Sequence, residues 1–449
     1  MTTHSTALTR RGLIAATAAA ASAVPAAAQQ ASPLPHGLRA GKPFNGRRLN
    51  ILAVVTPQFD ALMLRAGEFT EMTGIETRWD FTPFAALQEK VAATGVAADG
   101  SYDVVNYLDS WGPANAHWFL RLDRLLARDG LSMDRYPQAF ARGASFKGEV
   151  TGLPMRSHAQ LFFYRRDIFD ELGLAAPTTW EGVVEHGKAI RARKPDVEPL
   201  SLWFHADGNR QNLFHWMNFV WSAGGQVFDE RTRPAWTSAA AMEATEFYVG
   251  LLTRERIANP ASVSFVEQDA RVSFQQGRAA MIPIWWWAYS PMITPGQSTL
   301  NREQLAFSGM PSYKGRTVTS AITMPFSISQ HSRQQDAAWE FLKWVSNPDL
   351  DRRNAVERTV GGRSIQNNVV NHKTSLMDPE VNAANAGVPQ AGMRSLENSD
   401  VMPQLPEWPE VGDAISTAIA RAAAGGDTRR LMTEAANRSA DILRRAGYR

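Results

Sequence analysis

The clearest pattern of apolar and polar positions lies between residues 49 and 81. A continuous apolar run over 49–56 has the length of a buried strand, and the apolar residues that follow from Phe59 recur at helical spacing. Gly74 stands where that helix would end, and residues 75–81 then alternate between apolar and polar as a half-buried strand does. Strand, helix and strand in this order predict a βαβ unit and a mostly parallel sheet.

Similar patterns recur along the rest of the chain. Thr178 and Glu181 have the spacing of a capping box, and Pro283 places the strand that contains it at a sheet edge or ends it there. Further strands are predicted over 104–105, 161–164, 200–204 and 279–284, and further helices from about 180 to 193, around 336–345, and over 410–443 with a break at 425–426. These elements predict an α/β protein of about two domains.

Length, composition and charge narrow the class of protein. A chain of 449 residues is long for one domain, and 44% hydrophobic with 20% charged residues is typical of a folded globular protein. No apolar run approaches the roughly 20 residues that span a bilayer. The formal charge is +3, and removal of residues 1–28 takes away two arginines and no acidic residue, leaving +1. A nearly neutral protein is not expected to bind nucleic acid.

The first 28 residues have the pattern of an export signal. Arg10 and Arg11 precede an alanine-rich apolar stretch over 13–24, and 26–28 offers small residues for cleavage before Gln29. The paired arginines favour the twin-arginine route over a Sec signal. The chain contains no cysteine to accept a lipid anchor, so we expect a periplasmic protein, free of the membrane, in a bacterium with two membranes. Residues 29–48, rich in Pro, Gly and Ala, are predicted to be a flexible leader.

Catalytic and metal-binding motifs are not found in the sequence. The phosphate-binding loop, the His-Glu-x-x-His zinc motif and the Gly-x-Ser-x-Gly elbow are missing, and the nine histidines are scattered. We therefore expect no enzyme activity, no cofactor and no metal. A glycosidase stays an alternative, because its two carboxylates need no local motif.

Tryptophan is unusually frequent, with fourteen in the chain. Trp111 follows the predicted strand at 104–105, and three consecutive tryptophans at 285–287 follow the strand at 279–284. One face of a pyranose presents C–H groups that pack on an aromatic plane, so sugar binding needs such rings. Core packing is the alternative, although three consecutive strand residues cannot all point to one face.

Several longer segments carry a family resemblance. They are Gly-Leu-Pro at 152–154, residues 161–169, Leu-Gly-Leu at 172–174, Pro-Thr-Thr-Trp-Glu at 177–181, and Phe-Gln-Gln-Gly-Arg-Ala-Ala-Met at 274–281. In this order the segments resemble the family 1 extracellular solute-binding proteins of ABC importers, which include the maltose-binding type. The resemblance covers nearly all of the chain after the leader.

That resemblance implies a two-lobed periplasmic-binding-protein fold with discontinuous lobes and a ligand cleft at the hinge. The expected lobes are 49–156 with 306–356, and 157–305 with 357–449. The chain would cross between them near 155–159, 306–309 and 356–363. A ligand that contacts both lobes favours the closed form, which a membrane permease then recognises.

The ligand-binding residues nominated by the resemblance come from loops and strands that face the cleft in the family. They are Gln58, Asp109, Trp111, Arg156, His158, Asn218, Trp221, Trp285, Trp287 and Arg363. Trp287 aligns best with the family's sugar-stacking tryptophan. Each of several others has a structural alternative: a helix cap for Asp109, an ion pair between lobes for Arg156, a satisfied buried histidine for His158, and helix packing for Trp221.

The predicted function is that of a monomeric receptor that binds a sugar, oligosaccharide or polyol and delivers it to ABC permease subunits. Two alternatives stay open: a secreted carbohydrate-active enzyme, and a binding protein for a non-sugar solute. Arg156 and Arg363 could pair with a carboxylate, so an acidic ligand stays a further alternative. The sequence does not separate transport from a chemosensory role.

Overall fold

Residues 48–82 form the predicted βαβ unit in the computed structural model, which describes residues 37–448. Strands β1 (Arg48–Val54) and β2 (Glu76–Thr82) pair in parallel, and helices α1 (Pro57–Leu64) and α2 (Ala66–Thr73) connect them. Gly74 ends α2 in the left-handed conformation with φ 72°, and its N–H donates to the carbonyl oxygen of Thr70. The glycine end of this helix is therefore confirmed.

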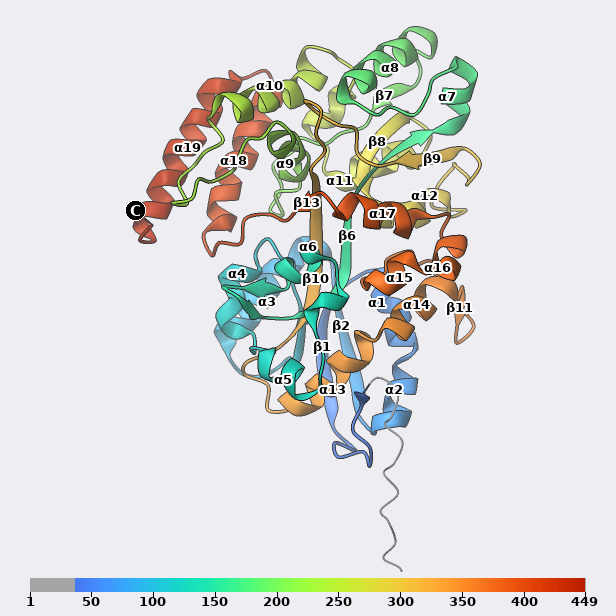
Figure 1. The fold of residues 1–449 in the computed structure, drawn as a ribbon, viewed down its shortest axis with the longest axis vertical. Coiled ribbons are helices and arrows are strands. Elements are labelled where there is room, and N and C mark those ends of the chain that lie inside the picture. Colours follow the sequence, from blue (N-terminus) through green and yellow to red (C-terminus); the bar gives the residue numbers. More distant parts are fainter. Residues whose placement is uncertain (1–36, 449) are drawn as a thin grey trace, which may run out of the picture.

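Two α/β lobes are stacked along the long axis of the molecule, and the long strands β6 (Leu153–Arg165) and β10 (Thr319–Ile328) run between them (Figure 1). The strand order is β2-β1-β3-β10-β6-β8-β7, in which β10 is antiparallel to both of its neighbours. The remaining strands are β3 (Val104–Asn106), β4 (Ser145–Phe146), β5 (Glu149–Val150), β7 (Glu198–Leu200), β8 (Ala279–Trp285), β9 (Leu305–Ser308), β11 (Thr359–Val360), β12 (Arg363–Ser364) and β13 (Ser399–Asp400). One sheet path therefore passes through both lobes.

Helices cover the sheet in both lobes (Figure 1). Up to β6 they are α3 (Phe84–Ala97), α4 (Gly112–Asn115), α5 (Asp123–Arg128) and α6 (Gln138–Gly143). Between β6 and β10 they are α7 (Arg166–Leu172), α8 (Trp180–Arg193), α9 (Asn212–Ser222), α10 (Ala239–Thr253), α11 (Glu267–Gln275) and α12 (Tyr289–Ile293). After β10 they are α13 (Gln335–Val345), α14 (Pro348–Val356), α15 (Lys373–Met377), α16 (Pro379–Ala384), α17 (Val388–Leu396), α18 (Trp408–Ala423) and α19 (Thr428–Arg445).

The core of the first lobe joins the βαβ unit to α13. Phe59 stacks on Phe326 of β10 with ring centroids 4.8 Å apart, and Phe69 meets the edge of Phe341 at 5.7 Å. The predicted apolar face of α13 is buried as expected, with Ala338, Phe341, Leu342 and Val345 all at 2% exposure or less. The late helices are also confirmed, since α18 and α19 are separated at residues 424–427.

Several local predictions need correction. The helix α8 is capped by Thr179, whose hydroxyl accepts from the Gly182 amide, and not by Thr178. Strand β7 ends at Leu200, where 200–204 was expected, and β6 extends well before the predicted start at 161. Pro283 lies inside β8, at a position where β6 pairs with β8 but β7 does not. Because β7 does not extend to Pro283, the missing N–H of this proline removes no hydrogen bond between β7 and β8.

The last part of the predicted leader packs on the first lobe. Residues 37–47 of the predicted flexible leader contact α13, where Lys343 donates to the Gly37 carbonyl at 2.7 Å and the Arg39 amide donates to Glu340 at 3.0 Å. The predicted signal peptide and residues 29–36 lie outside the described residues.

Strand β6 contains residues 155–159, where the first crossing is predicted, and the strands near the two later predicted crossings are arranged as follows. Residues 306–308 belong to β9, which pairs with the second half of β6, so β10 makes the return. The hairpin of β11 and β12 packs on α1 through Val360 and Ala61. The chain leaves later, through β13, which pairs with Thr319 and Ser320 of β10 before α18 begins.

Candidate functional site

The middle of β6 carries two of the predicted site residues where the lobes meet. Arg156 and His158 alternate with Ser157 and so share one face of the strand, opposite Met324 and Ile322 of β10. The Arg156 Nε donates to the Thr56 hydroxyl at 3.2 Å, and its Nη1 lies 3.4 Å from the Met324 sulfur. Burial lowers the pKa of Arg156 to about 10, with a smaller opposing effect from Glu267. The guanidinium stays charged at neutral pH.

Trp287 is partly exposed and lies against two guanidinium groups. The guanidinium carbons of Arg156 and Arg271 are 5.1 and 5.2 Å from its ring centroid, within the range of cation–π attraction. Arg271, on α11, also donates to Glu267 at 3.1 Å and to Gln275 at 2.8 Å. The structure therefore joins Trp287 to Arg156, and it adds Arg271 and Glu267, which the sequence did not single out.

His158 is fully buried and has no hydrogen-bond partner for either ring nitrogen within residues 37–448. Its ring lies 5.0 Å from that of Trp285. Burial holds the pKa of His158 well below its usual value, and the Arg156 charge adds to this effect. The imidazole is therefore neutral, with one nitrogen able to donate and the other to accept. The alternative of a satisfied buried histidine does not fit these contacts.

The loop after β3 carries further unpartnered polar groups. One carboxylate oxygen of Asp109 accepts from the Thr323 amide at 2.9 Å, while the other has no partner in the described chain. Burial raises the pKa of Asp109 to about 8, so the carboxyl is largely protonated at neutral pH. Ser110 Oγ and Trp111 Nε1 are buried without partners as well. Helix α4 begins at Gly112 with no side-chain cap, so Asp109 is not a helix cap.

Gln58 joins this region from α1. Its Nε2 donates to the Met155 carbonyl of β6 at 2.7 Å, and its buried Oε1 has no partner among the described residues. Buried polar atoms normally find a partner, because each one left unpaired costs about 1–3 kcal/mol. Atoms of this kind also occur elsewhere in both lobes, for example on Tyr136, Trp203 and Ser439, but on α1, the β3 loop and β6 they lie beside the meeting point of the lobes.

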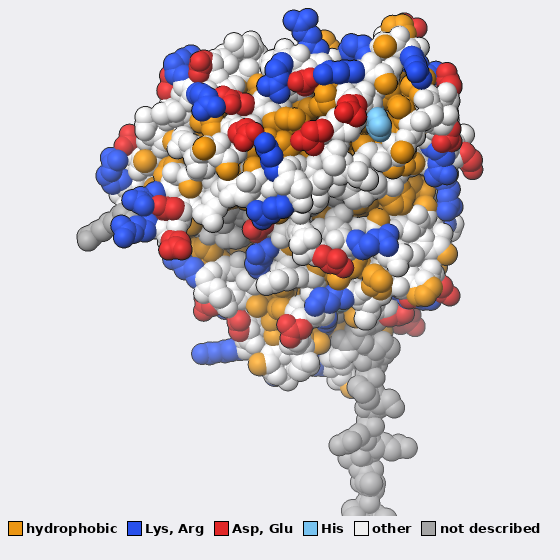
Figure 2. All heavy atoms as spheres, turned by 45° about the horizontal axis from the view of Figure 1, so that its top comes forward, with side chains coloured by type: hydrophobic (Ala, Val, Ile, Leu, Met, Phe, Trp, Pro, Cys, Tyr) orange, Lys and Arg blue, Asp and Glu red, His pale blue; other side chains and the backbone are white. Residues whose placement is uncertain are grey.

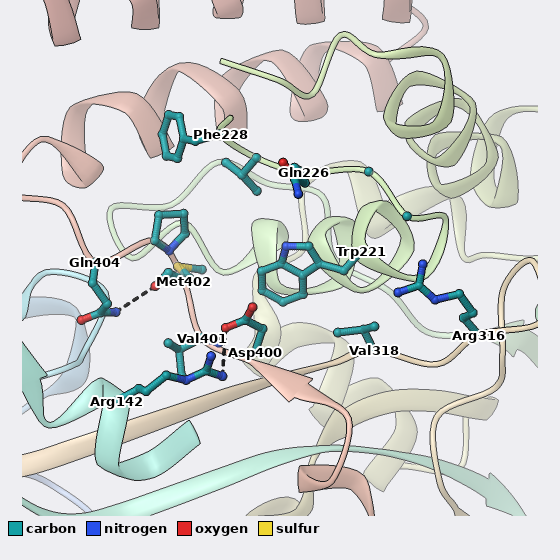
Figure 3. A pocket seen from close by; sticks show the side chains of 14 residues that line it. Arg142, Trp221, Gln226, Phe228, Arg316, Val318, Asp400, Val401, Met402 and Gln404 are labelled. Atoms are coloured by element: carbon teal, nitrogen blue, oxygen red, sulfur yellow. Dashed lines mark hydrogen bonds and ion pairs between the residues drawn. The ribbon is translucent and has the colours of Figure 1, made fainter. Parts of the chain in front are cut away.

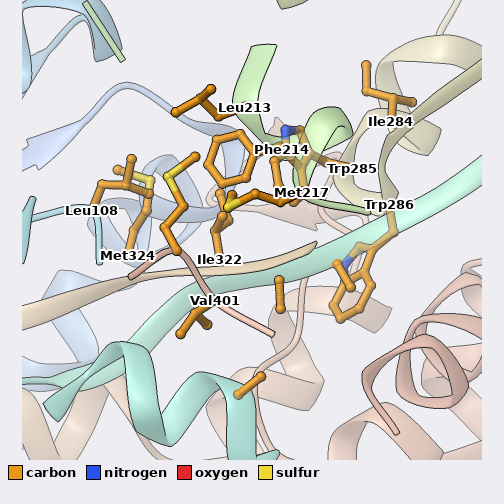
Figure 4. Packing of buried hydrophobic residues seen from close by; sticks show 14 of the residues in the cluster. Leu108, Leu213, Phe214, Met217, Ile284, Trp285, Trp286, Ile322, Met324 and Val401 are labelled. Atoms are coloured by element: carbon orange, nitrogen blue, oxygen red, sulfur yellow. The ribbon is translucent and has the colours of Figure 1, made fainter. Parts of the chain in front are cut away.

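Apolar side chains from both lobes belong to one buried cluster, part of which is seen in Figure 4. Leu108 and Met324 lie near Leu213 and Phe214 of α9. Phe214 in turn meets Trp285 edge-on, with centroids 4.7 Å apart. An apolar surface with a few placed polar groups is typical of small-molecule sites.

A polar contact also crosses between the lobes. Arg210, just before α9, donates to Gln88 of α3 at 3.1 Å and to Asp413 of α18 at 2.8 Å. Its backbone has φ 57°, which is uncommon for a residue with a side chain and holds Arg210 in a turn. The sequence offered no signal for this contact beyond its loop-like setting after Gly208.

Two nominated residues, Asn218 and Arg363, make contacts away from Trp287. Asn218 donates to Gln160 of β6 and accepts from the Ser320 amide of β10, both at 2.6 Å, so it links the two crossing strands. Arg363 is exposed on the hairpin of β11 and β12, near Asp60. Neither is brought together with Trp287 by a described contact.

Trp221 lines a separate recess of about 740 Å³ at the end of α9 (Figure 3). Arg142 of α6 and Asp400 of β13 form an ion pair across this recess at 3.1 Å. No other nominated residue lines it. No residue that lines this recess is Trp285 or Trp287, so a shared site for the three tryptophans stays a prediction.

The described residues do not suggest metal or nucleic-acid chemistry. No group of three or more His, Asp or Glu side chains in residues 37–448 is placed to hold a metal ion. Basic and acidic side chains are interspersed over one face of the molecule (Figure 2). Among the helices of residues 37–448, none is both long and apolar enough to cross a membrane.

The fold matches known proteins. A maltose-bound MalE3 of T. maritima aligns over 88% of this chain and 99% of its own, with TM-score 0.77 and 19% identity. A solute-binding protein of Agrobacterium radiobacter K84 in complex with ribitol covers 89% and 100%, with TM-score 0.76 and 22% identity. These likenesses confirm the two-lobed α/β fold.

Sequence comparison gives the family. A protein of Sinorhizobium fredii described as a probable amino-acid ABC transporter periplasmic-binding protein is 24% identical over 381 residues, covering 83% of this chain and 82% of the relative. The model of the bacterial extracellular solute-binding protein family matches residues 53–350. That family consists of binding proteins, which confirms the expectation of a receptor over an enzyme. This chain belongs to the bacterial extracellular solute-binding proteins, as the receptor component of an ABC transporter.

Proposed function

We propose that this protein binds a sugar or polyol between its lobes and delivers it to the membrane subunits of an ABC permease. The observation that carries the proposal is the group of buried polar atoms without protein partners, on Gln58, Asp109, Ser110, Trp111 and His158. They lie where the two crossing strands meet the first lobe, beside apolar and aromatic surface.

A polyhydroxylated ligand suits this mixture of groups. Each hydroxyl both donates and accepts, so it can satisfy an amide oxygen such as Gln58 Oε1 and an indole N–H such as Trp111 Nε1. Its C–H faces can pack on the rings of Trp285 or Phe214. Maltose and ribitol in the similar structures support this ligand class.

The proposal includes the division of the chain into lobes. The first lobe would hold 49–156 and the second 157–305, as expected from the sequence. The return through β10 and the exit through β13 would replace the expected crossings at 306–309 and 356–363. The remaining nominated residues, Asn218, Trp221 and Arg363, would act in positioning or lie outside the ligand site.

The cellular setting is proposed as well. A monomer, exported through the twin-arginine route and free in the periplasm, fits the sequence of residues 1–28 and a family that works outside the cytoplasm. Replacement of Arg10 and Arg11 by lysine is expected to leave the full-length precursor in the cytoplasm. Normal export of that variant would favour the Sec route.

A thermal-shift screen tests the ligand class. Monosaccharides, disaccharides, oligosaccharides and polyols are tested against amino acids and polyamines, with titration calorimetry on any compound that raises the melting temperature. We expect stabilisation by a sugar or polyol, since ligand at 100 times its Kd adds about 2.7 kcal/mol. Stabilisation by an amino acid or polyamine alone would overturn the sugar assignment, and consumption of a glycoside would indicate an enzyme.

A further inference from the structure

Arg156 is a cation without an ion pair. No carboxylate lies within 4.0 Å of its guanidinium nitrogens in the described part of the chain. Its two hydrogen-bond partners are a hydroxyl, on Thr56, and a sulfur, on Met324, both of which are neutral. A guanidinium has five N–H donors, and the Arg156 side chain is partly exposed. Most of the hydrogen-bonding capacity of Arg156 is therefore unused by the protein.

Glu267, the acidic side chain that acts on Arg156, and Asp207, which acts on Glu267, are both engaged elsewhere. Glu267 acts on Arg156 only through space, because its carboxylate accepts from Arg271 at 3.1 Å. Asp207, which acts on Glu267, accepts from the backbone and side-chain amides of Gln211, each at 3.0 Å. Neither carboxylate hydrogen-bonds to Arg156, so the positive charge beside Trp287 is not neutralised locally.

The Trp287 ring helps to hold this charge in place. With the guanidinium 5.1 Å from the ring centroid and Nε fixed by Thr56, the position of Arg156 is set from two sides. A guanidinium held in this way can present parallel N–H groups to a carboxylate, which is the geometry that distinguishes arginine from lysine. Arg156 also shares its strand face with the unpartnered His158. A carboxylate on Arg156 would therefore place the rest of a ligand beside hydroxyl-binding groups.

We propose that the ligand is a sugar acid, a polyhydroxylated chain or ring with one carboxylate, and that Arg156 binds that carboxylate. This inference rests on the proposed sugar or polyol function and narrows its ligand class. A cationic ligand would meet Arg156 and Arg271 with only Glu267 to oppose them, and Glu267 is already paired. A neutral sugar would leave the charge of Arg156 without a counter-ion.

Matched pairs of compounds test the proposal on the wild-type protein. Titration calorimetry compares glucuronate with glucose, galacturonate with galactose, and gluconate with glucitol, at one ionic strength. We expect the acid of at least one pair to bind at least tenfold more tightly than its neutral partner. Equal or tighter binding of the neutral member in every pair that binds would overturn the inference and leave the proposed function standing.

A pair of variants then assigns the carboxylate to Arg156. Arg156→Gln should reduce the affinity for the acid to within about threefold of the neutral compound, while Arg156→Lys retains part of the preference. Arg429→Gln is the matched control, since Arg429 is an exposed arginine of α19 that pairs with Glu246 of α10. Equal losses for acid and neutral compound in Arg156→Gln would show a general packing role and overturn the assignment. Binding of succinate or glutamate, with none of the six compounds bound, would overturn both this inference and the proposed function.

Discussion

Replacement of Asp109 by asparagine should remove a pH dependence from the stability of the protein. The carboxyl is fully buried, with one oxygen accepting from the Thr323 amide at 2.9 Å and the other without a partner in residues 37–448. Burial raises the pKa of Asp109 to about 8, and backbone hydrogen bonds from Thr323 and Ser110 only partly oppose this effect. Asparagine has the same shape as the protonated acid and keeps an oxygen for the Thr323 amide, so we expect the variant to fold.

The sign and the ceiling of the effect follow from the two pKa values. Between about pH 4 and pH 8 the folded protein holds the Asp109 proton, whereas the unfolded chain, with a pKa of about 3.9, releases it. The contribution of this group to stability is therefore full below pH 4 and declines as the pH rises to 8. A difference of about four pKa units, at about 1.4 kcal/mol each, sets a ceiling of about 6 kcal/mol. Water entering as the lobes open reduces it, and we expect about 2–4 kcal/mol between pH 5 and pH 8.

Urea unfolding at pH 5 and pH 8 measures this effect on the wild type, on Asp109→Asn, and on Asp196→Asn as an exposed acidic control. His158 and His215 have lowered pKa values and so favour the folded state more as the pH rises through about 6.5. They are present in every protein compared, and their effect cancels in the difference. An equal change in unfolding free energy from pH 5 to pH 8 in Asp109→Asn and the wild type would refute the reasoning.

Two further comparisons separate ligand contacts from packing. Trp287→Ala should weaken binding of the best ligand at least tenfold with little loss of melting temperature. Trp339→Ala removes a buried ring whose N–H donates to Asp129 at 2.6 Å, so it should lower the free energy of unfolding by about 3–5 kcal/mol and leave ligand affinity unchanged. The reverse balance would place Trp287 in the core. Gln88→Ala removes the 3.1 Å hydrogen bond that Arg210 donates across the lobes, which should make the closed form about 1 kcal/mol less stable. Ligand binding should then weaken up to about fivefold. The radius of gyration of the ligand-free protein, measured by X-ray scattering, should increase. Unchanged affinity and radius of gyration would show that this hydrogen bond does not stabilise the closed form.

The parts of the fold that were predictable have regular burial. The βαβ unit at 48–82 was recognisable because its strand, helix and glycine cap each carry a local signal. Strand β6 was predicted only from 161, because Arg156, Ser157 and His158 interrupt the apolar pattern of its first half. Those polar residues lie in a strand because β10 pairs with them, and that pairing joins residues far apart in the sequence.

The candidate site was predictable only where it follows a strand. Asp109, Trp111 and Trp287 were nominated from loops after strands, and the structure leaves polar atoms of the first two without partners. Arg271 and Glu267 were missed because a pair four residues apart on a helix usually lies in solvent. Their proximity to Trp287 depends on how α11 packs beside β8, and no local pattern records that packing.

Under the proposed function, the buried polar groups would give a physical reason for ligand-dependent closure. With the lobes in contact, Gln58, Asp109 and His158 hold polar atoms away from water without protein partners, at a cost of about 1–3 kcal/mol for each group. Opening the lobes returns these atoms to water and relieves that cost, whereas a ligand that bonds to them relieves it in the closed form. A ligand can shift the equilibrium only by its difference in affinity for the two forms. Bonds to about three such groups supply roughly 3–9 kcal/mol of that difference, and about 5.5 kcal/mol is enough to turn a 1:99 equilibrium into 99:1. If the proposed site is correct, the unpaired polar atoms of these side chains would let a small ligand shift the lobes toward the closed form.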